Sequence, residues 1–143
     1  MSAIEVPSLV NEAGHFYTNR KDLKENAGIE DVKNELIAQI EKVYKHGLSP
    51  SHLDSHMYTV GVSEEFLDVY KELGLRYKLP IQLNKKLIAS SGANPYELEL
   101  PGDFYVDEIV LGNYSVFEQN KLFQFYENAL DSAQEGLTVI LIH

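Results

Sequence analysis

Apolar residues recur at the spacing of an α-helix in three stretches of this chain, over residues 30–46, 63–74 and 122–136. Steps of three and four residues place such positions on one side of a helix, where they can face a core. These positions are Val32, Leu36, Ile37, Ile40, Val43 and Tyr44, then Phe66, Leu67, Tyr70 and Leu73, and then Leu122, Phe123, Tyr126, Ala129, Leu130 and Ala133. The stretches close on Gly47, Gly74 and Gly136. The pattern predicts three amphipathic helices, each ended by its glycine.

A short segment of extended character follows each predicted helix. These segments are residues 50–57, 79–83 and 137–143. The last is apolar on both faces, as in a buried parallel strand. Repetition of helix, glycine, loop and strand predicts an α/β fold with parallel strands and right-handed crossovers. Glycine, proline and asparagine interrupt residues 1–28 and 84–114, which are expected to be irregular, although 96–100 and 104–111 could form short strands.

A sheet of three predicted strands has two open edges, which natural domains usually cover. The terminal apolar strand adds hydrophobic surface that one copy cannot easily bury. The sequence therefore indicates either a piece of a larger α/β domain or a domain that completes itself as a homo-oligomer.

Composition and charge exclude several classes of function. The chain of 143 residues has a formal net charge of −10, which argues against nucleic acid or an anionic membrane as the main partner. It has no cysteine, so disulfides, thiolate metal sites and cysteine nucleophiles are excluded. No apolar run is long enough to span a membrane and no signal peptide is recognisable, so a cytoplasmic protein is expected.

The residues with chemical capability gather where predicted strands end. His52, Asp54 and His56 are two residues apart, so in a strand they would share one face and could bind a divalent metal or form an acid/base pair. The alternative is that the histidines are hydrogen-bonded residues of a strand end and Asp54 is a turn acceptor. The second strand is followed by Asn84, Lys85 and Lys86, and the third ends in His143. Parallel strands would place His56 and His143 at the same edge of the sheet.

The segment PSHLDSH, residues 50–56, resembles the P-T-H-L-D-S-H motif of the YdjC-like carbohydrate deacetylases. These enzymes remove acetyl groups from chitooligosaccharides and related N-acetylated sugars. Further similar segments are residues 7–17, 30–47, 74–83 and the terminal VILIH. The resemblance covers most of the chain and implies a parallel-stranded (β/α) barrel-like fold, of which residues 1–143 would form a single partial domain, an incomplete barrel fragment.

The resemblance also implies a divalent metal, Mg²⁺ or Zn²⁺, and roles for four residues. His56 matches a metal ligand, His52 stands beside it as a second candidate ligand, and Asp54 would orient the ligand histidine. His143 would protonate the leaving amine or line the pocket. The family's D-D-F-G and H-L-x-L segments, which carry its other ligands, have no counterpart in this sequence, and Gln82 stands where an arginine is common.

Two hypotheses of different classes follow. In the first, this chain is part of a metal-dependent deacetylase that hydrolyses the N-acetyl groups of an oligosaccharide. The second is a non-catalytic, oligomerising α/β fragment that retains half a site. Of the family's three metal ligands only one has a counterpart here, His56, and a single ligand will not hold a metal ion tightly. The 143-residue chain alone is therefore expected to release no acetate.

The open edges generate the first testable prediction. The chain is expected to self-associate, because bare strand edges and a terminal apolar strand favour association. Light scattering at micromolar concentration measures this directly, and a monomeric mass across the concentration series would contradict it.

Overall fold

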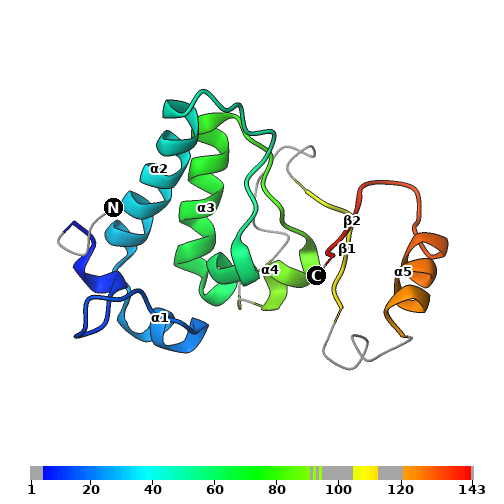
Figure 1. The fold of residues 1–143 in the computed structure, drawn as a ribbon, viewed down its shortest axis with the longest axis horizontal. Coiled ribbons are helices and arrows are strands. Elements are labelled where there is room, and N and C mark those ends of the chain that lie inside the picture. The colour runs from blue at the N-terminus through cyan, green and yellow to red at the C-terminus, as the bar shows by residue number, and fades with distance from the viewer. Residues whose placement is uncertain (1–4, 91, 93, 95–104, 113–120, 143) are drawn as a thin grey trace.

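A computed structural model of the chain describes residues 5–90, 92, 94, 105–112 and 121–142. Its elements are the 3₁₀ segments η1 (Pro7–Leu9) and η2 (His56–Val62), the helices α1 (Arg20–Asn26), α2 (Ile29–Lys45), α3 (Glu64–Tyr77), α4 (Lys85–Ser90) and α5 (Leu122–Asp131), and the strands β1 (Glu108–Val110) and β2 (Thr138–Ile140). Helices α2 and α3 lie side by side in one half of the molecule, and β1, β2 and α5 form the other (Figure 1). No described helix combines the length and the apolar character needed to cross a membrane.

The three predicted helices are confirmed as α2, α3 and α5, but two of them do not end at the predicted glycine: α5 ends at Asp131, before Gly136, and α3 does not end at Gly74. It continues to Tyr77, and Lys78 takes the left-handed conformation, with φ of +55°, that closes the helix. The N–H of Leu79 then donates to the carbonyl of Gly74, 2.9 Å away. Glycine permits a helix end without requiring one, and Gly74 is buried inside α3.

Two regions expected to be irregular contain regular structure. Helix α1 lies within residues 1–28 and starts at Asn19, whose side chain accepts a hydrogen bond from the N–H of Asp22. Residues 84–114 contain both α4 and β1. The possible strand at 104–111 is confirmed in part by β1, whereas the possible strand at 96–100 lies outside the described residues.

The strands β1 and β2 are parallel, as predicted, but among the described residues after α2 extended segments occur at four places rather than three. The single bridge before α1, which joins Val10 to Phe16, is antiparallel. β1 pairs with β2 in parallel, with Ile109 opposite Val139. Single parallel bridges join Leu53 to Ile81 and Leu83 to Tyr105. Four extended segments therefore follow one another in chain order, separated by helices. The α/β class with parallel strands is confirmed, while closure into a barrel is not seen among the described residues.

Helix α3 organises the core from its middle. Leu67 and Tyr70 of α3 pack with Ile81 and Leu83 of the neighbouring extended segment and with Ile88 of α4. Other apolar side chains of α3 pack against α2 in two further clusters of buried residues. Burial of these aliphatic side chains is the main source of stability for the region that carries the candidate site.

The N-terminal segment is attached to α2 by hydrogen bonds as well as by apolar contacts. The backbone N–H and the hydroxyl of Ser8 both donate to the Asp31 carboxylate, at 2.8 and 2.7 Å. The Ser8 hydroxyl also accepts from the N–H of Gly28, at the start of α2. These donors favour the ionised form, with the side-chain bond as the larger influence, so they hold the pKa of Asp31 below its usual value.

Two tyrosines near the strand at Leu53, the buried Tyr70 and the half-buried Tyr58, differ in whether their hydroxyls have hydrogen-bond partners. The hydroxyl of Tyr70 donates to the carbonyl of Leu53 at 2.5 Å. The hydroxyl of Tyr58 is buried and has no hydrogen-bond partner among the described residues, and its desolvation raises the pKa of Tyr58 to about 12. Tyr58 also has a left-handed backbone, with φ of +52°, and its ring fills the space that a Cβ at Gly61 would need. Substitution of Gly61 would therefore displace Tyr58.

These tyrosines give a matched pair of substitutions. Tyr70→Phe is expected to lower the free energy of unfolding by about 1 kcal/mol or more, because it leaves the buried Leu53 carbonyl with one donor fewer. Tyr58→Phe is expected to leave that free energy unchanged or to raise it by up to about 1 kcal/mol, because it removes an unsatisfied buried hydroxyl. Urea unfolding followed by circular dichroism measures both, and equal losses for the two variants would contradict the assignment of the hydrogen bonds.

Candidate functional site

The candidate site is built on the extended segment that follows α2. The N–H of Leu53 donates to the carbonyl of Pro80 at 2.8 Å, and the N–H of Gln82 donates to the carbonyl of Leu53 at 2.9 Å. Leu53 itself packs against the main core cluster. Because neighbouring side chains of a strand point to opposite faces, His52 and Asp54 are directed away from this core and are exposed.

Gln82 holds the carboxylate of Asp54. A carboxylate only accepts hydrogen bonds, so the Gln82 side chain is oriented with its NH₂ group toward Asp54. In this orientation the nitrogen donates to both carboxylate oxygens, at 3.2 Å to Oδ2 and at closer range to Oδ1. The contact follows from the backbone register, because pairing of Leu53 with Ile81 brings residues 54 and 82 to adjacent strands at the same level.

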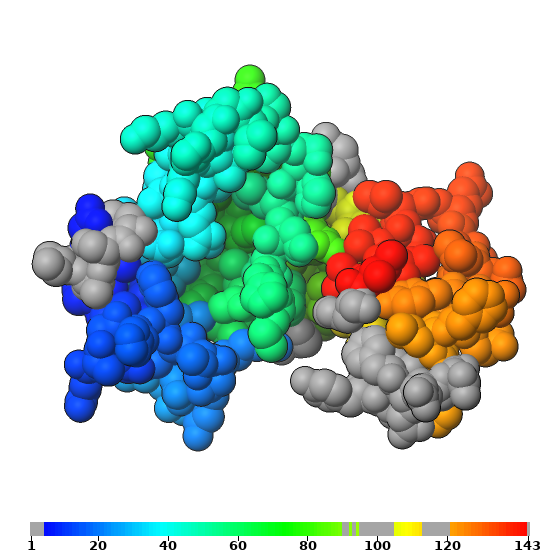
Figure 2. All heavy atoms as spheres, viewed as in Figure 1, coloured from blue at the N-terminus to red at the C-terminus, as the bar shows by residue number. Residues whose placement is uncertain are grey.

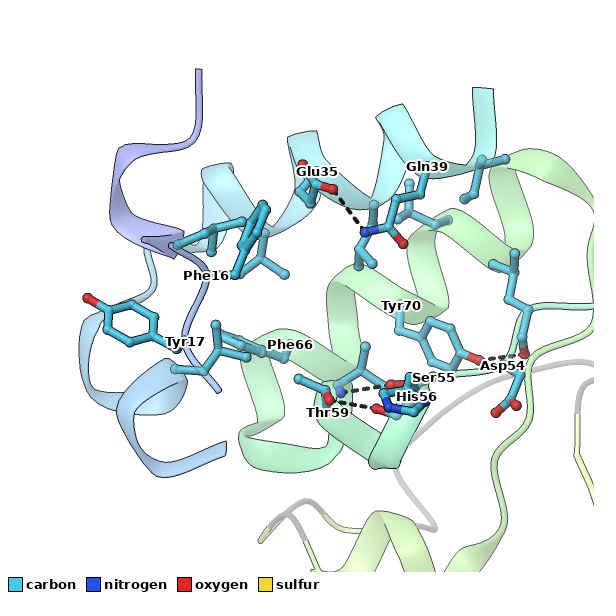
Figure 3. A pocket seen from close by; sticks show the side chains of 18 residues that line it. Phe16, Tyr17, Glu35, Gln39, Asp54, Ser55, His56, Thr59, Phe66 and Tyr70 are labelled. Atoms are coloured by element: carbon cyan, nitrogen blue, oxygen red, sulfur yellow. Dashed lines mark hydrogen bonds between the residues drawn. The ribbon is translucent and has the colours of Figure 1, made fainter. Parts of the chain in front are cut away.

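The chain leaves the strand direction immediately after Asp54. The N–H of Tyr58 donates to the carbonyl of Ser55 at 2.7 Å, and the N–H of Val60 donates to the Ser55 hydroxyl at 3.1 Å. The Thr59 hydroxyl closes the next turn on the carbonyl of His56 at 2.6 Å (Figure 3). His56 is thus the first residue of η2 rather than the last residue of a strand.

Two cavities adjoin this segment, and Asp54 borders both. The first has a volume of about 400 Å³ and lies between α2, α3 and residues 53–60, where the surface is hollowed in Figure 2. His56 lines it, as Figure 3 shows. The second has a volume of about 470 Å³, and His52, Gln82 and alternate residues of the β2 segment line it together with Asp54. The two histidines therefore face different cavities.

The expectation that residues 52, 54 and 56 share one strand face is wrong. The strand ends at Asp54, and the turn that begins at His56 redirects that side chain. His52 places its ring nitrogen Nδ1 2.8 Å from the hydroxyl of Ser51. The strand-end hydrogen bonding considered as the alternative for the histidines is thus found for His52.

The described residues do not form a complete metal site. Across the described ranges, no three side chains of His, Cys, Asp or Glu come close enough to hold one metal ion. His52 and His56 are separated as above, and His143 lies outside the described residues. The predicted ligand roles, and the predicted position of His56 and His143 at the same edge of the sheet, remain predictions.

The polar residues after the second strand have structural roles. Asn84 is buried, and its side chain accepts a hydrogen bond from the N–H of Leu87 at 2.9 Å, which caps α4. Lys86 forms an ion pair with Glu108 at 2.9 Å. The sequence analysis did not identify the contacts of Gln82 with Asp54 and of Tyr70 with Leu53. The strand register could have indicated the first, whereas the second depends on how α3 packs.

Comparison with known proteins gives consistent results. A carbohydrate deacetylase of Enterococcus faecalis is 32% identical over 127 residues, covering 89% of this chain and 42% of that protein. A carbohydrate deacetylase of Geobacillus stearothermophilus is 41% identical over 78 residues, covering 54% of this chain and 31% of that protein. The chain thus spans less than half the length of these two relatives.

A crystal structure from Enterococcus faecalis, of a protein named for cellobiose-phosphate cleavage, superposes on this chain with a TM-score of 0.75 at 28% identity. The superposition covers 98% of this chain and 52% of that protein. The family model described as YdjC-like protein matches residues 1–143. Since this match extends over the whole sequence, the chain belongs to the YdjC-like protein family.

Proposed function

We propose that this chain is the part of a carbohydrate deacetylase that carries the strand-end element His52-Leu-Asp-Ser-His56. The observation that supports this proposal is the position of the element. It lies at the end of one of the parallel extended segments, which is where α/β folds place their sites, and the side chains of His52, Asp54 and His56 are exposed beside two cavities. The names of the curated relatives agree with this chemistry.

The proposed reaction is hydrolysis of an N-acetyl group on an oligosaccharide. Water adds to the acetyl carbon, the C–N bond breaks, and acetate and a free amine leave after one proton reaches the nitrogen. Imidazole exchanges protons near neutral pH, so His143, the last residue of the sequence, can supply this proton, while His56 is proposed as a metal ligand. Asp54, fixed by Gln82, can hold an imidazole or a sugar hydroxyl in one orientation.

The second cavity is the better candidate for the sugar. Its polar side chains include His52, Asp54 and Gln82, and its volume of about 470 Å³ lies within the usual range for small-molecule sites. The apolar residues from the β2 segment could contact the less polar face of a sugar ring. N-acetylated chitooligosaccharides are the substrates that we propose to test first.

The proposed divalent metal, Mg²⁺ or Zn²⁺, does not fit the described residues alone. His56 and His52 face different cavities, so either could serve only together with ligands from outside the described residues. This separation is also what favours the second candidate function, in which the chain by itself is a non-catalytic α/β unit that associates with further copies or other polypeptides.

A hybrid protein tests the proposed function. The 127 matched residues of the Enterococcus faecalis relative are replaced by the corresponding residues of this chain, and acetate release from N,N′-diacetylchitobiose is measured. The hybrid is expected to release acetate, and His56→Ala is expected to reduce the rate by about 100-fold or more, because it removes the residue that is proposed as a metal ligand. The 143-residue chain without the rest of the relative is expected to release none.

The matched control for the hybrid is His46→Ala, at the exposed end of α2. This substitution is expected to change the rate by no more than about twofold, as is usual for surface positions. A hybrid that is folded by circular dichroism but inactive, or one in which His56→Ala and His46→Ala behave alike, would contradict the proposed function.

A further inference from the structure

The second cavity has a carboxylate but no lysine or arginine among its described lining residues. Asp54 is the one acidic residue of that lining. All twelve lysine and arginine residues of the chain lie within the described ranges, and none of them lines either cavity. Apart from its histidines, this chain therefore places no cationic side chain where the charge of a bound anion could be neutralised.

The carboxylate of Asp54 is held by a neutral partner. The NH₂ group of Gln82 donates to both of its oxygens, and Asp54 takes part in no salt bridge with the lysine and arginine residues of the described chain. A carboxylate has about four acceptor positions, so further positions are left for a ligand on the exposed side of Asp54.

The rest of this cavity is mainly apolar. Pro80 and Ile81 line one side, and alternate residues from Leu137 to Leu141 line the other. Apolar walls reduce the screening of a charge by water, although Asp54 itself is exposed and the reduction is therefore partial. The charge of a ligand should consequently discriminate more strongly in this cavity than the number of its hydroxyl groups.

We propose that the second cavity selects sugars that carry a free amino group and rejects phosphorylated ones; this selectivity rests on the proposed function, which places a sugar there. Asp54 accepts a hydrogen bond from the ammonium group at C2 of a glucosamine unit. Gln82 is the specificity-determining residue, because it orients this carboxylate without pairing with its charge. An arginine in the place of Gln82 would pair with Asp54 and favour phosphate instead.

The proposed selectivity has a consequence for the reaction. Hydrolysis of an N-acetyl group turns a neutral amide into an amine that takes up a proton, so it creates the group that Asp54 would bind. A partly deacetylated oligosaccharide is therefore expected to bind this chain more tightly than the fully acetylated one.

Binding of four disaccharides to the 143-residue chain tests the proposal. The probes are chitobiose with both amino groups free, N,N′-diacetylchitobiose, cellobiose, which has hydroxyls in place of the amines, and cellobiose phosphate. Calorimetry is carried out at about pH 7, where such amines are mostly protonated, with EDTA present so that no divalent cation occupies Asp54. Chitobiose is expected to bind about tenfold more tightly than cellobiose or N,N′-diacetylchitobiose, since a charge-assisted hydrogen bond is worth about that much. Cellobiose phosphate is expected to bind more weakly than cellobiose, and added salt should reduce both differences.

Three substitutions assign the preference to this pair of residues. Gln82→Arg is expected to reduce the preference for chitobiose over cellobiose to less than about twofold, because the guanidinium pairs with Asp54. Asp54→Asn is expected to do the same by removing the charge with little change in size, which keeps the test valid if Gln82→Arg does not fold. The matched control is Gln124→Arg, which adds the same charge at an exposed position of α5 that lines neither cavity. It is expected to leave the preference at about tenfold, as for a remote surface site.

The position of the bound sugar is followed by NMR through the side-chain NH₂ signals of Gln82. Chitobiose is expected to shift these signals, whereas cellobiose at the same concentration should shift them less. Shifts confined to residues of the first cavity would contradict the proposed position.

The proposal is overturned if chitobiose and cellobiose bind equally well, or if neither binds. It is also overturned if Gln82→Arg and Gln124→Arg reduce the preference equally, because net charge alone would then explain it. A hybrid that releases acetate while this chain shows no preference for the amine would contradict this proposal alone. An inactive hybrid together with a preserved preference would contradict the proposed function alone.

Discussion

The carbonyl of Leu53 accepts two hydrogen bonds, one from the backbone N–H of Gln82 and one from the hydroxyl of Tyr70. These two hydrogen bonds join the segment around Leu53 to α3 and to the neighbouring extended segment. Tyr70 anchors the segment to α3, while Gln82 anchors it to the neighbouring extended segment. Burial raises the pKa of Tyr70, so its hydroxyl stays protonated and remains a donor throughout the physiological pH range. The backbone that carries His52 and Asp54, the polar residues on either side of Leu53, is therefore held in place.

The anchored backbone at Leu53 explains why Asp54 is exposed to solvent and yet held in one position. The side chain of Leu53 turns into the core, so Asp54 must turn outward, and the register with Ile81 gives it Gln82 as a partner. A neutral amide holds a carboxylate by hydrogen bonding without neutralising its charge, unlike an arginine. Asp54 is thus held by Gln82 in a position between the two cavities.

The two cavities have different surroundings. One is mainly apolar. The other contains His52, Asp54 and Gln82 beside apolar residues of the β2 segment, which suits a sugar.

The sequence by itself determined the helices and the fold class. Helical spacing identified α2, α3 and α5, because an amphipathic stripe depends only on local order. The repeated helix and strand predicted parallel pairing, and the heptapeptide at residues 50–56 indicated the family. The short helices α1 and α4 were not predicted, because their local signals are weak beside those of glycine and proline.

Tertiary structure alone decided how the candidate residues are arranged. Period-two spacing put His52, Asp54 and His56 on one face, but the turn from Ser55 to Val60 ended the strand and sent His56 into another cavity. Likewise, Gly74 became an interior residue of α3, because the contacts of Leu79 closed that helix one turn later. The partners of Leu53 and Asp54 are distant in sequence, and a hydrogen bond between distant residues is set by packing and strand register, which local patterns do not contain.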